Sequence, residues 1–207
     1  MIPISRSIRP DEIRALDVKF DLPSGATISN IAKTLYVTTD NAKTDVASTK
    51  IAGTGIAGDY ARIVFQALAI GVFYHLKVEA ELSTAQTLIE RWIIQCAKEQ
   101  IKGEVLPESG RRSYWIDFSH KLPAGVNIDT SITTFTAYDE SDAAQTDISA
   151  SLIAGYASSG QVLQVDCENG TKDKDYVINM LAGSLADSIT NMTYKVGLTF
   201  IVPCREY

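Results

Sequence analysis

The chain contains two histidines, His75 and His120, and histidine is the side chain that most readily exchanges protons or binds metals near neutral pH. Neither has a cysteine or a second histidine at the spacing of a zinc site. His75 alternates with apolar residues in the segment 74–80, which places it on the polar side of a strand. We therefore predict surface or interface histidines rather than a metal ligand or a general base.

Residues 53–58 read GTGIAG and match the glycine spacing of a dinucleotide-binding loop. Such a loop must lead from a strand into a helix, whose N-terminus holds the phosphates. The sequence after Gly58 predicts a further short strand, so we interpret 53–58 as a plain loop. The sequence contains no nucleophile-elbow or phosphate-loop pattern. We predict that the protein is not an enzyme, and we assign no catalytic, cofactor-binding or metal-binding residue.

Two acidic segments could supply oxygen ligands to a calcium ion. The first is 138–142, YDESD, and the second is 166–170, DCENG, which is followed by Asp173 and Asp175. Neither segment has the spacing of a calcium-binding loop. Solvated hairpin tips are the favoured interpretation, and calcium binding stays open.

Tryptophans and cysteines complete the set of chemically distinctive residues. Trp92 and Trp115 adjoin aliphatic residues in predicted strands, so packing in a core or between domains is favoured over a sugar-binding platform. The three cysteines are an odd number, and we predict reduced thiols. Cys96 and Cys204 end the last predicted strands of two similar segments and are expected to be equivalent packing positions, whereas Cys167 ends the predicted strand 161–167.

The elements that must position these residues repeat along the chain. Residues 74–80, YHLKVEA, have the two-residue period of a half-buried strand. An offset of 102 superimposes 74–80 on 176–182 and 44–53 on 146–155, and an offset of 100 superimposes 22–28, LPSGATI, on 122–128, LPAGVNI. Three matched segments in the same order indicate a duplicated domain.

The repeats set the expected domain boundaries. We predict an N-terminal arm over 1–12, a first domain over 13–97, a linker over 98–111 and a second domain over 112–207. Short alternating strands, with roughly 100 residues per repeat, predict an all-β fold of two tandem immunoglobulin-like, fibronectin-like β-sandwiches. No helix is predicted; 46–51 and 147–153 are assigned to strands. The two halves are expected to fold independently.

Three local features carry further expectations. The last hairpin of the second repeat is six residues longer than that of the first, which makes 183–191 a candidate functional loop. Tyr74 and Tyr176 open equivalent strands and are expected to be buried, with hydroxyls bonded to the backbone as in a tyrosine corner. The arm is expected to be too irregular to stabilise its own sandwich, and to pack on a neighbouring subunit.

Composition narrows the class of protein. A net charge of −6 and a pI near 4.9 disfavour nucleic-acid binding, which needs a basic face. The chain has no apolar run near the ~18 residues of a membrane helix. The N-terminal residues lack the pattern of a secretory signal, so we expect a protein that is used without export by that route.

Each repeat combines an acidic proline motif, an aromatic strand that contains Asp, a Leu-Pro-x-Gly turn, a glycine-containing loop and a strand led by Tyr. The matching segments are 10–12, 17–20, 22–28, 53–58 and 74–76 in the first repeat, and 107–108, 115–118, 122–128, Gly155 and 176–178 in the second. In these features each repeat resembles the fibre-to-tail adaptor and neck-associated immunoglobulin-like proteins of phage virions.

The resemblance implies a non-enzymatic virion structural protein made in the cytoplasm of the host bacterium. It also implies a homo-oligomeric ring around the tail or neck that connects a fibre or an adjacent ring. The implied partners are other virion proteins, such as tail, neck, portal-proximal or fibre proteins, and neither nucleic acid nor a membrane. A capsid decoration protein and a carbohydrate-binding module remain alternatives.

Overall fold

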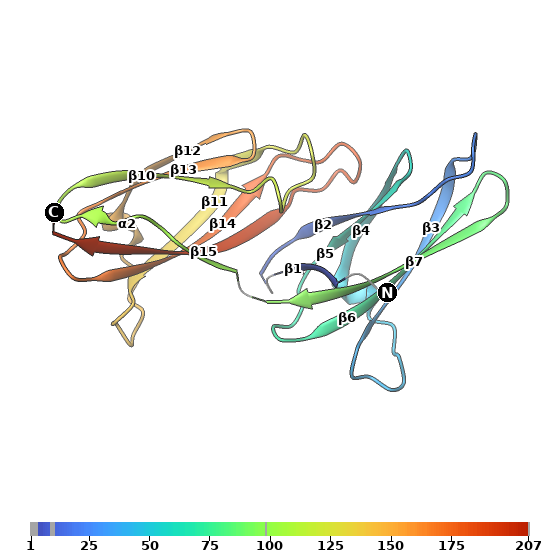
Figure 1. Cartoon of the computed structure of the whole chain (residues 1–207), viewed down its shortest axis with the longest axis horizontal. Coiled ribbons are helices and arrows are strands. Elements are labelled where there is room, and N and C mark those ends of the chain that lie inside the picture. The colour runs from blue at the N-terminus through green and yellow to red at the C-terminus, as the bar shows by residue number, and fades with distance from the viewer. Residues whose placement is uncertain (1–3, 9–10, 98, 207) are drawn as a thin grey trace. The chain divides into compact units, whose positions relative to one another are not determined.

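The chain forms two compact units, and unit 1 is discontinuous in sequence. The computed structural model describes residues 4–8, 11–97 and 99–206 (Figure 1). Unit 1 consists of Met1–Lys98 together with Ala186–Tyr194, and unit 2 of Glu99–Leu185 together with Lys195–Tyr207. The expected boundaries therefore fail at the segment 186–194, which lies in the second half of the sequence but packs in unit 1.

Unit 1 is a sandwich of two sheets. One sheet has the order β1-β7-β6-β3, and the other has the order β2-β5-β4. The elements are β1 (Ile4–Ile8), β2 (Arg14–Lys19), β3 (Ile28–Val37), α1 (Ala47–Lys50), β4 (Ile51–Ala57), β5 (Tyr60–Phe65), β6 (Phe73–Leu82) and β7 (Thr87–Cys96).

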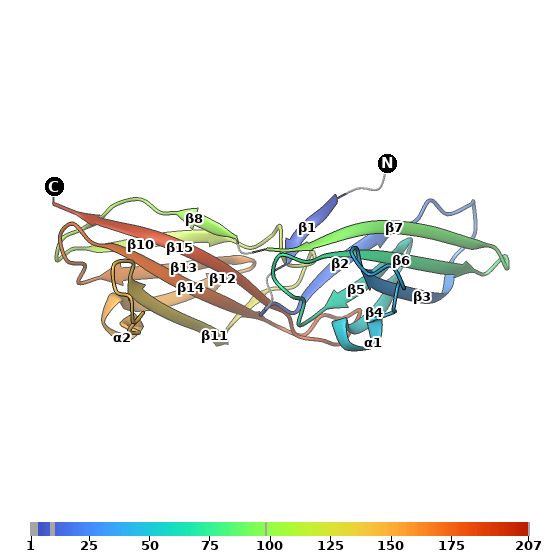
Figure 2. The same ribbon diagram turned by 90° about the horizontal axis from the view of Figure 1, so that it is seen from below.

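Unit 2 repeats this arrangement (Figures 1 and 2). Its sheets have the orders β10-β13-β12 and β11-β14-β15-β8, and β9 also pairs with β15. The elements are β8 (Gln100–Lys102), β9 (Leu106–Pro107), β10 (Arg111–Asp117), β11 (Ile128–Asp139), α2 (Ser149–Leu152), β12 (Ile153–Ser159), β13 (Val162–Glu168), β14 (Asp175–Ser184) and β15 (Lys195–Arg205).

The strand order identifies the fold. In both units one sheet has the order of strands B, E and D of an immunoglobulin-like sandwich, and the other contains C, F and G. This confirms the predicted all-β, immunoglobulin-like fold. Within the described ranges, no helix is long and apolar enough to cross a membrane.

The predicted alternation of β6 is present in the structure. Tyr74, Leu76, Val78 and Ala80 are all buried, while the residues between them are partly exposed. Burying one large apolar side chain contributes about 1.5–3 kcal/mol, so this face of β6 is a major part of the core of unit 1.

Both tyrosine corners are present as expected. Tyr74 is 2% exposed, and its hydroxyl accepts a hydrogen bond of 2.9 Å from the backbone N–H of Ala69. Tyr176 is 4% exposed, and its hydroxyl accepts one of 2.8 Å from the N–H of Thr171. Each bond reaches five residues back along the chain, so the two repeats share this corner in detail.

The expected arm and linker contribute strands to the sandwiches. β1 pairs in parallel with β7, where Ile8 lies opposite Cys96 and is 3% exposed. β9 pairs in parallel with β15, where Leu106 lies opposite Cys204 and is fully buried. The predictions that 1–12 is an irregular arm and that 98–111 is only a linker are therefore wrong over 4–8, 100–102 and 106–107. Residues 1–3, 9–10 and 98 lie outside the described residues.

Two predicted strands begin as single helical turns, α1 and α2. Asp45 Oδ1 accepts hydrogen bonds from the backbone N–H groups of Leu35 and Ala47. An aspartate that bonds the N–H two residues ahead favours a turn over an extended chain. Asp147 makes the same two bonds in the second repeat, to Ala137 and Ser149. The apolar residues that predict strands over 46–51 and 147–153 instead pack from these turns.

Candidate functional site

The histidines take part in ordinary surface contacts. The His75 ring stacks on Tyr36 with centroids 5.1 Å apart and an interplanar angle of 11°. His120 Nε2 lies 3.2 Å from a carboxylate oxygen of Glu99. In the part of the chain that the structure describes, no three His, Cys, Asp or Glu side chains are placed to hold a metal ion. The three cysteines are free and buried.

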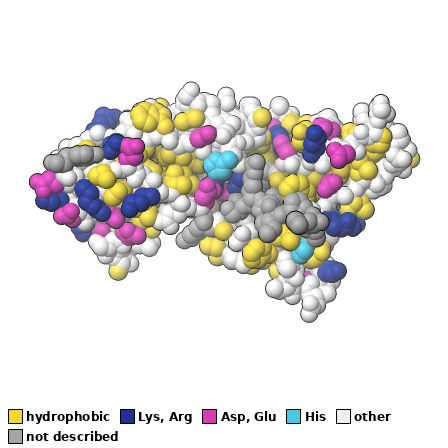
Figure 3. Space-filling view, viewed as in Figure 1, with side chains coloured by type: hydrophobic (Ala, Val, Ile, Leu, Met, Phe, Trp, Pro, Cys, Tyr) yellow, Lys and Arg dark blue, Asp and Glu magenta, His cyan; other side chains and the backbone are white. Residues whose placement is uncertain are grey.

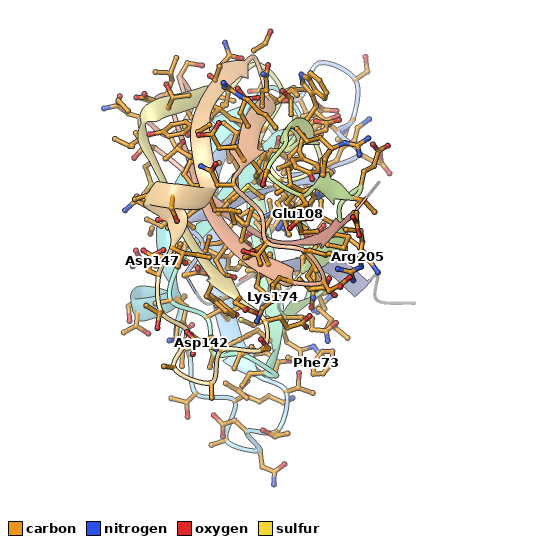
Figure 4. All side chains as sticks on the ribbon, turned by 90° about the vertical axis from the view of Figure 1, so that its left-hand side faces the viewer. Phe73, Glu108, Asp142, Asp147, Lys174 and Arg205 are labelled. Atoms are coloured by element: carbon orange, nitrogen blue, oxygen red, sulfur yellow. The ribbon has the colours of Figure 1, made fainter. Side chains whose placement is uncertain are left out.

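The oxygens of the first acidic segment, 138–142, bind neighbours within their own unit. Asp139 accepts hydrogen bonds from Ser141 and lies 2.6 Å from Lys174 Nζ. The hydrogen bond from Lys174, together with those from Ser141, lowers the pKa of Asp139 to about 2. Asp142, labelled with Lys174 in Figure 4, accepts bonds from two backbone N–H groups. These contacts hold the segment in place without an ion, but the predicted hairpin tip is wrong: β11 and the next strand, β12, lie in different sheets, so the segment begins a loop between sheets.

Asp166, in the second acidic segment, 166–170, belongs to the outer surface of the sheet β10-β13-β12. Its carboxylate accepts hydrogen bonds from Ser113 at 2.5 Å, Gln164 at 3.0 Å and Arg111 at 2.8 Å. Ser113 makes the largest contribution to lowering the pKa of Asp166 to about 2, followed by Gln164 and Arg111. This network fixes the polar side chains on that surface.

Residues 53–57 form strand β4 rather than the predicted loop. Gly55 is required by a close approach of the segment 186–194, in which the backbone oxygen of Ile189 would lie 2.9 Å from an added Cβ. A Cβ atom at Gly55 would lie 2.7 Å from Cγ2 of Ile189, and one at Gly53 would overlap the side chain of Met192. Larger residues would therefore separate 186–194 from the outer surface of β4.

The segment 186–194 is held in unit 1 by a buried ion pair. Arg62 Nη1 lies 2.9 Å from Asp187 Oδ1, and Nε and Nη2 of Arg62 each lie 2.6 Å from Asp17. The side chains of Arg62 and Asp187 are 6% and 2% exposed. Hydrogen bonding to Asp17 raises the pKa of Arg62 above its ordinary value, so the guanidinium stays charged between two carboxylates.

Asp187 also organises its own segment. Its carboxylate accepts hydrogen bonds from the hydroxyls of Tyr194, at 2.6 Å, and Thr190, at 2.8 Å, and from the backbone N–H of Ile189. Burial raises the pKa of Asp187, but these bonds and Arg62 outweigh burial and lower it to about 2. The predicted functional loop 183–191 thus overlaps a packed structural segment. Nothing in the sequence of this segment predicts that it packs in unit 1.

The two repeats differ sharply on this sheet surface. In unit 1, the backbone of Arg62 on β5 lies opposite Asp17 on β2 and opposite Gly55 on β4. In unit 2 the equivalent row across β10, β13 and β12 is Trp115, Gln164 and Ala157. The unit 1 row lies under 186–194, whereas Trp115 in unit 2 is 68% exposed.

Trp115 is thus not the packing residue that we expected. Its neighbours Tyr114 and Ile116 are buried, so strand alternation directs Trp115 outward. This alternation is visible in the sequence and could have predicted the exposure. Trp92, in contrast, packs partly buried against the core of unit 1, as expected.

The outward residues of β10, β13 and β12 form the candidate binding surface, which we call the open face of unit 2. Its principal side chains are Arg111, Ser113, Trp115, Asp117, Gln164 and Ala157. A hollow of about 110 Å³ lies beside Trp115 and is lined by small and polar residues, including Ala157, Ser158 and Ser159. A protruding indole next to a shallow hollow is suited to binding rather than to catalysis.

No family model and no curated protein matches this chain. Solved structures with similar folds include a titin A168–A169 fragment, at 8% identity over 97% of this chain and 93% of that one, with a TM-score of 0.26. SporoSAG from Toxoplasma gondii aligns at 8% identity over 97% and 95%, with a TM-score of 0.28. Dpr2 Ig1-Ig2, solved in complex with DIP-Theta, aligns at 7% over 100% and 96%, with a TM-score of 0.28. These similarities concern the fold alone. The strand order and tyrosine corners define a protein of two immunoglobulin-like sandwiches.

Proposed function

We propose that this chain is a non-enzymatic structural protein of a bacteriophage particle, which assembles around the tail or neck and connects a fibre or an adjacent ring to it. The observation that carries the proposal is the open face of unit 2, where Trp115 is 68% exposed on a broad sheet surface. Such a surface suits contact with another protein, because exposed aromatic side chains supply much of the binding energy at protein interfaces. The resemblance of both repeats to phage adaptor and neck proteins supports the same role.

The charge distribution is compatible with protein partners. On the face shown in Figure 3, Lys and Arg side chains are interspersed with Asp and Glu rather than gathered in one basic area. The net charge is −6. Mixed charges of this kind favour specific protein contacts over binding to the phosphate backbone of nucleic acid.

The proposal is tested by locating the protein in phage particles. Particles are purified from a host that carries the gene, their proteins are identified by mass spectrometry, and an antibody against this chain is imaged by immunogold labelling. We expect the chain in the particles and gold at the neck or tail. Label over the capsid would support the decoration-protein alternative, and particles without the chain would contradict a virion role.

Trp115 also favours a second candidate, a carbohydrate-binding module. A sugar ring can stack on an exposed indole, and Gln164, Ser158 and Ser159 line the adjacent hollow with polar groups. Affinity electrophoresis in gels that contain bacterial surface polysaccharides would test this candidate. Retardation of the parent that disappears in Trp115→Ala would support it, and equal mobility in every gel would reject it.

A further inference from the structure

We infer that the open face of unit 2 binds the same face of a second copy of this chain, and that the two copies form a two-fold symmetric dimer. The inference deepens the proposed structural role but needs no phage origin, since it rests on the comparison of the two repeats and on the shape of this face.

The equivalent surface of unit 1 is covered by polypeptide. The segment 186–194 lies on the outer surface of β4 and β5, where Ile189 meets Gly55 and Asp187 meets Arg62. Unit 2 presents the same three-stranded surface from the duplicated half of the chain, with Ala157 and Gln164 at those positions. The mode of covering in unit 1 shows that this sheet surface accepts a polypeptide.

The unit 2 surface, in contrast, carries an exposed apolar side chain. At 68%, Trp115 is the most exposed large hydrophobic side chain among the described residues. Exposed aromatic groups that stand next to a hollow are typical anchors of protein interfaces. Burial of the indole by a partner would remove its apolar surface from water.

The open face also contains a glycine that the isolated unit does not require. Gly155 is the equivalent of Gly53, where an added Cβ would overlap Sδ of Met192 unless that flexible side chain moved. Among the described residues, no atom lies within 4 Å of a Cβ built at Gly155, and its φ is not positive. Neither backbone conformation nor packing in this chain calls for glycine there, whereas close approach of a partner would.

The open face is complementary to itself in shape. It carries both a protruding side chain, Trp115, and a hollow of about 110 Å³ beside it. A two-fold axis lying between the two faces can place each indole in the hollow of the other copy.

The test is sedimentation velocity of the full chain over about a hundredfold range of concentration. We expect a reversible monomer–dimer equilibrium in the parent. Trp115→Ala removes the anchor and should raise the dimer Kd at least about thirtyfold, as for an interface hot spot. Gly155→Leu should do the same by adding bulk to the interface, and it leaves the fold intact because the Cβ site is open.

A matched control is Ile70→Ala, which truncates a 53% exposed apolar side chain of unit 1 and should leave the dimer Kd unchanged. A second measurement places the contact on the open face. In a Trp92→Phe variant all tryptophan fluorescence comes from Trp115, and we expect its emission to shift to shorter wavelength and its quenching by iodide to fall as dimers form.

Three outcomes would overturn the inference: a parent that stays monomeric throughout, a Trp115→Ala variant that dimerises like the parent, or a dimer in which Trp115 remains open to iodide. Binding of a polysaccharide to the monomer through Trp115, without dimers, would also overturn it in favour of a glycan. Particles that lack the chain would refute the proposed function and leave the dimer intact. A monomer that is nevertheless found in particles would refute the dimer alone.

Discussion

Substitution of Asp187 by Ala should destabilise unit 1, although Asp187 lies near the C-terminal end of the sequence. The carboxylate is 2% exposed and binds Arg62, Thr190 and Tyr194. Its removal leaves the guanidinium with fewer partners. It also removes an acceptor from the N–H of Ile189 and from the hydroxyls of Thr190 and Tyr194, which remain 2.9 Å from each other.

The magnitude follows from the geometry of the ion pair. Removing one partner of a buried ion pair costs about 3–5 kcal/mol. Arg62 keeps both bonds to Asp17, each of 2.6 Å, so we expect the lower end, about 3 kcal/mol. This loss is a large fraction of the ~5–15 kcal/mol that stabilises a domain.

The assay is urea unfolding followed by the fluorescence of Trp92 in a Trp115→Phe background, which reports on unit 1 alone. The control is Asp59→Ala, which breaks a surface contact of 3.7 Å with Lys19 between two exposed side chains and should cost less than about 1 kcal/mol. Residues 1–98 expressed alone should resemble Asp187→Ala or be less stable, because they lack 186–194 altogether.

An unfolding free energy of unit 1 within about 0.5 kcal/mol of the parent would refute this reasoning. It would show that 186–194 is not part of the cooperative structure of unit 1, whatever its contacts. Residues 1–98 that are as stable as unit 1 in the full chain would lead to the same conclusion, and would restore the simple division into two continuous halves.

Buried groups carry three further predictions. Folding lowers the pKa of Asp187 from 3.8 to about 2, so its contribution to the stability of unit 1 is present above pH ~4 and is lost as the pH falls towards 2. In urea titrations between pH 5 and 2, the unfolding free energy of the parent should fall by about 2 kcal/mol more than that of Asp187→Ala. Tyr74→Phe and Tyr176→Phe each leave a backbone N–H without its acceptor, so each should destabilise its own unit by about 1–3 kcal/mol in thermal unfolding, and a parent-like transition would contradict the corner. Ile8→Ala should lower the unfolding free energy of unit 1 by about 2–5 kcal/mol because Ile8 is in the core, and Leu106→Ala should do the same in unit 2. An Ile8→Ala variant as stable as the parent would support the prediction that residues 1–12 are an arm outside the sandwich.

The core strands and their repetition can be predicted from the sequence because their signals are local. In β6 and β14 the alternation of side chains and the leading tyrosine are set by residues close in sequence, so burial and both hydroxyl bonds are predictable. The parallel strand β1 is not, because its backbone partner, β7, lies about 90 residues away, and a five-residue edge strand has little pattern of its own.

The errors at the two sheet surfaces have a shared cause. Glycines weaken an isolated strand, so the sequence of β4 predicts a loop. In the structure, Gly53 and Gly55 leave room for the segment 186–194, whose Asp187 lies 125 residues beyond Arg62 in the sequence. The packing role expected of Trp115 rests on the aliphatic residues beside it in the predicted strand, although the buried Tyr114 next to it already places it outward. Local periodicity does not predict that 186–194 packs on unit 1, or that the equivalent surface of unit 2 stays exposed, since both depend on long-range contacts.

The discontinuity of unit 1 also delays its completion during synthesis, because residues 186–194 are translated after residues 99–185 of unit 2. Domains generally fold as they leave the ribosome, with the N-terminal one first. Here Arg62 must wait for Asp187, 125 residues later, while strands β8 to β14 of unit 2 emerge in between. Such long-range closure is slow compared with local pairing. The half that is translated first therefore acquires its last stabilising contact only near the end of translation, and until then its β2-β5-β4 surface is exposed, with Arg62 paired to Asp17 alone.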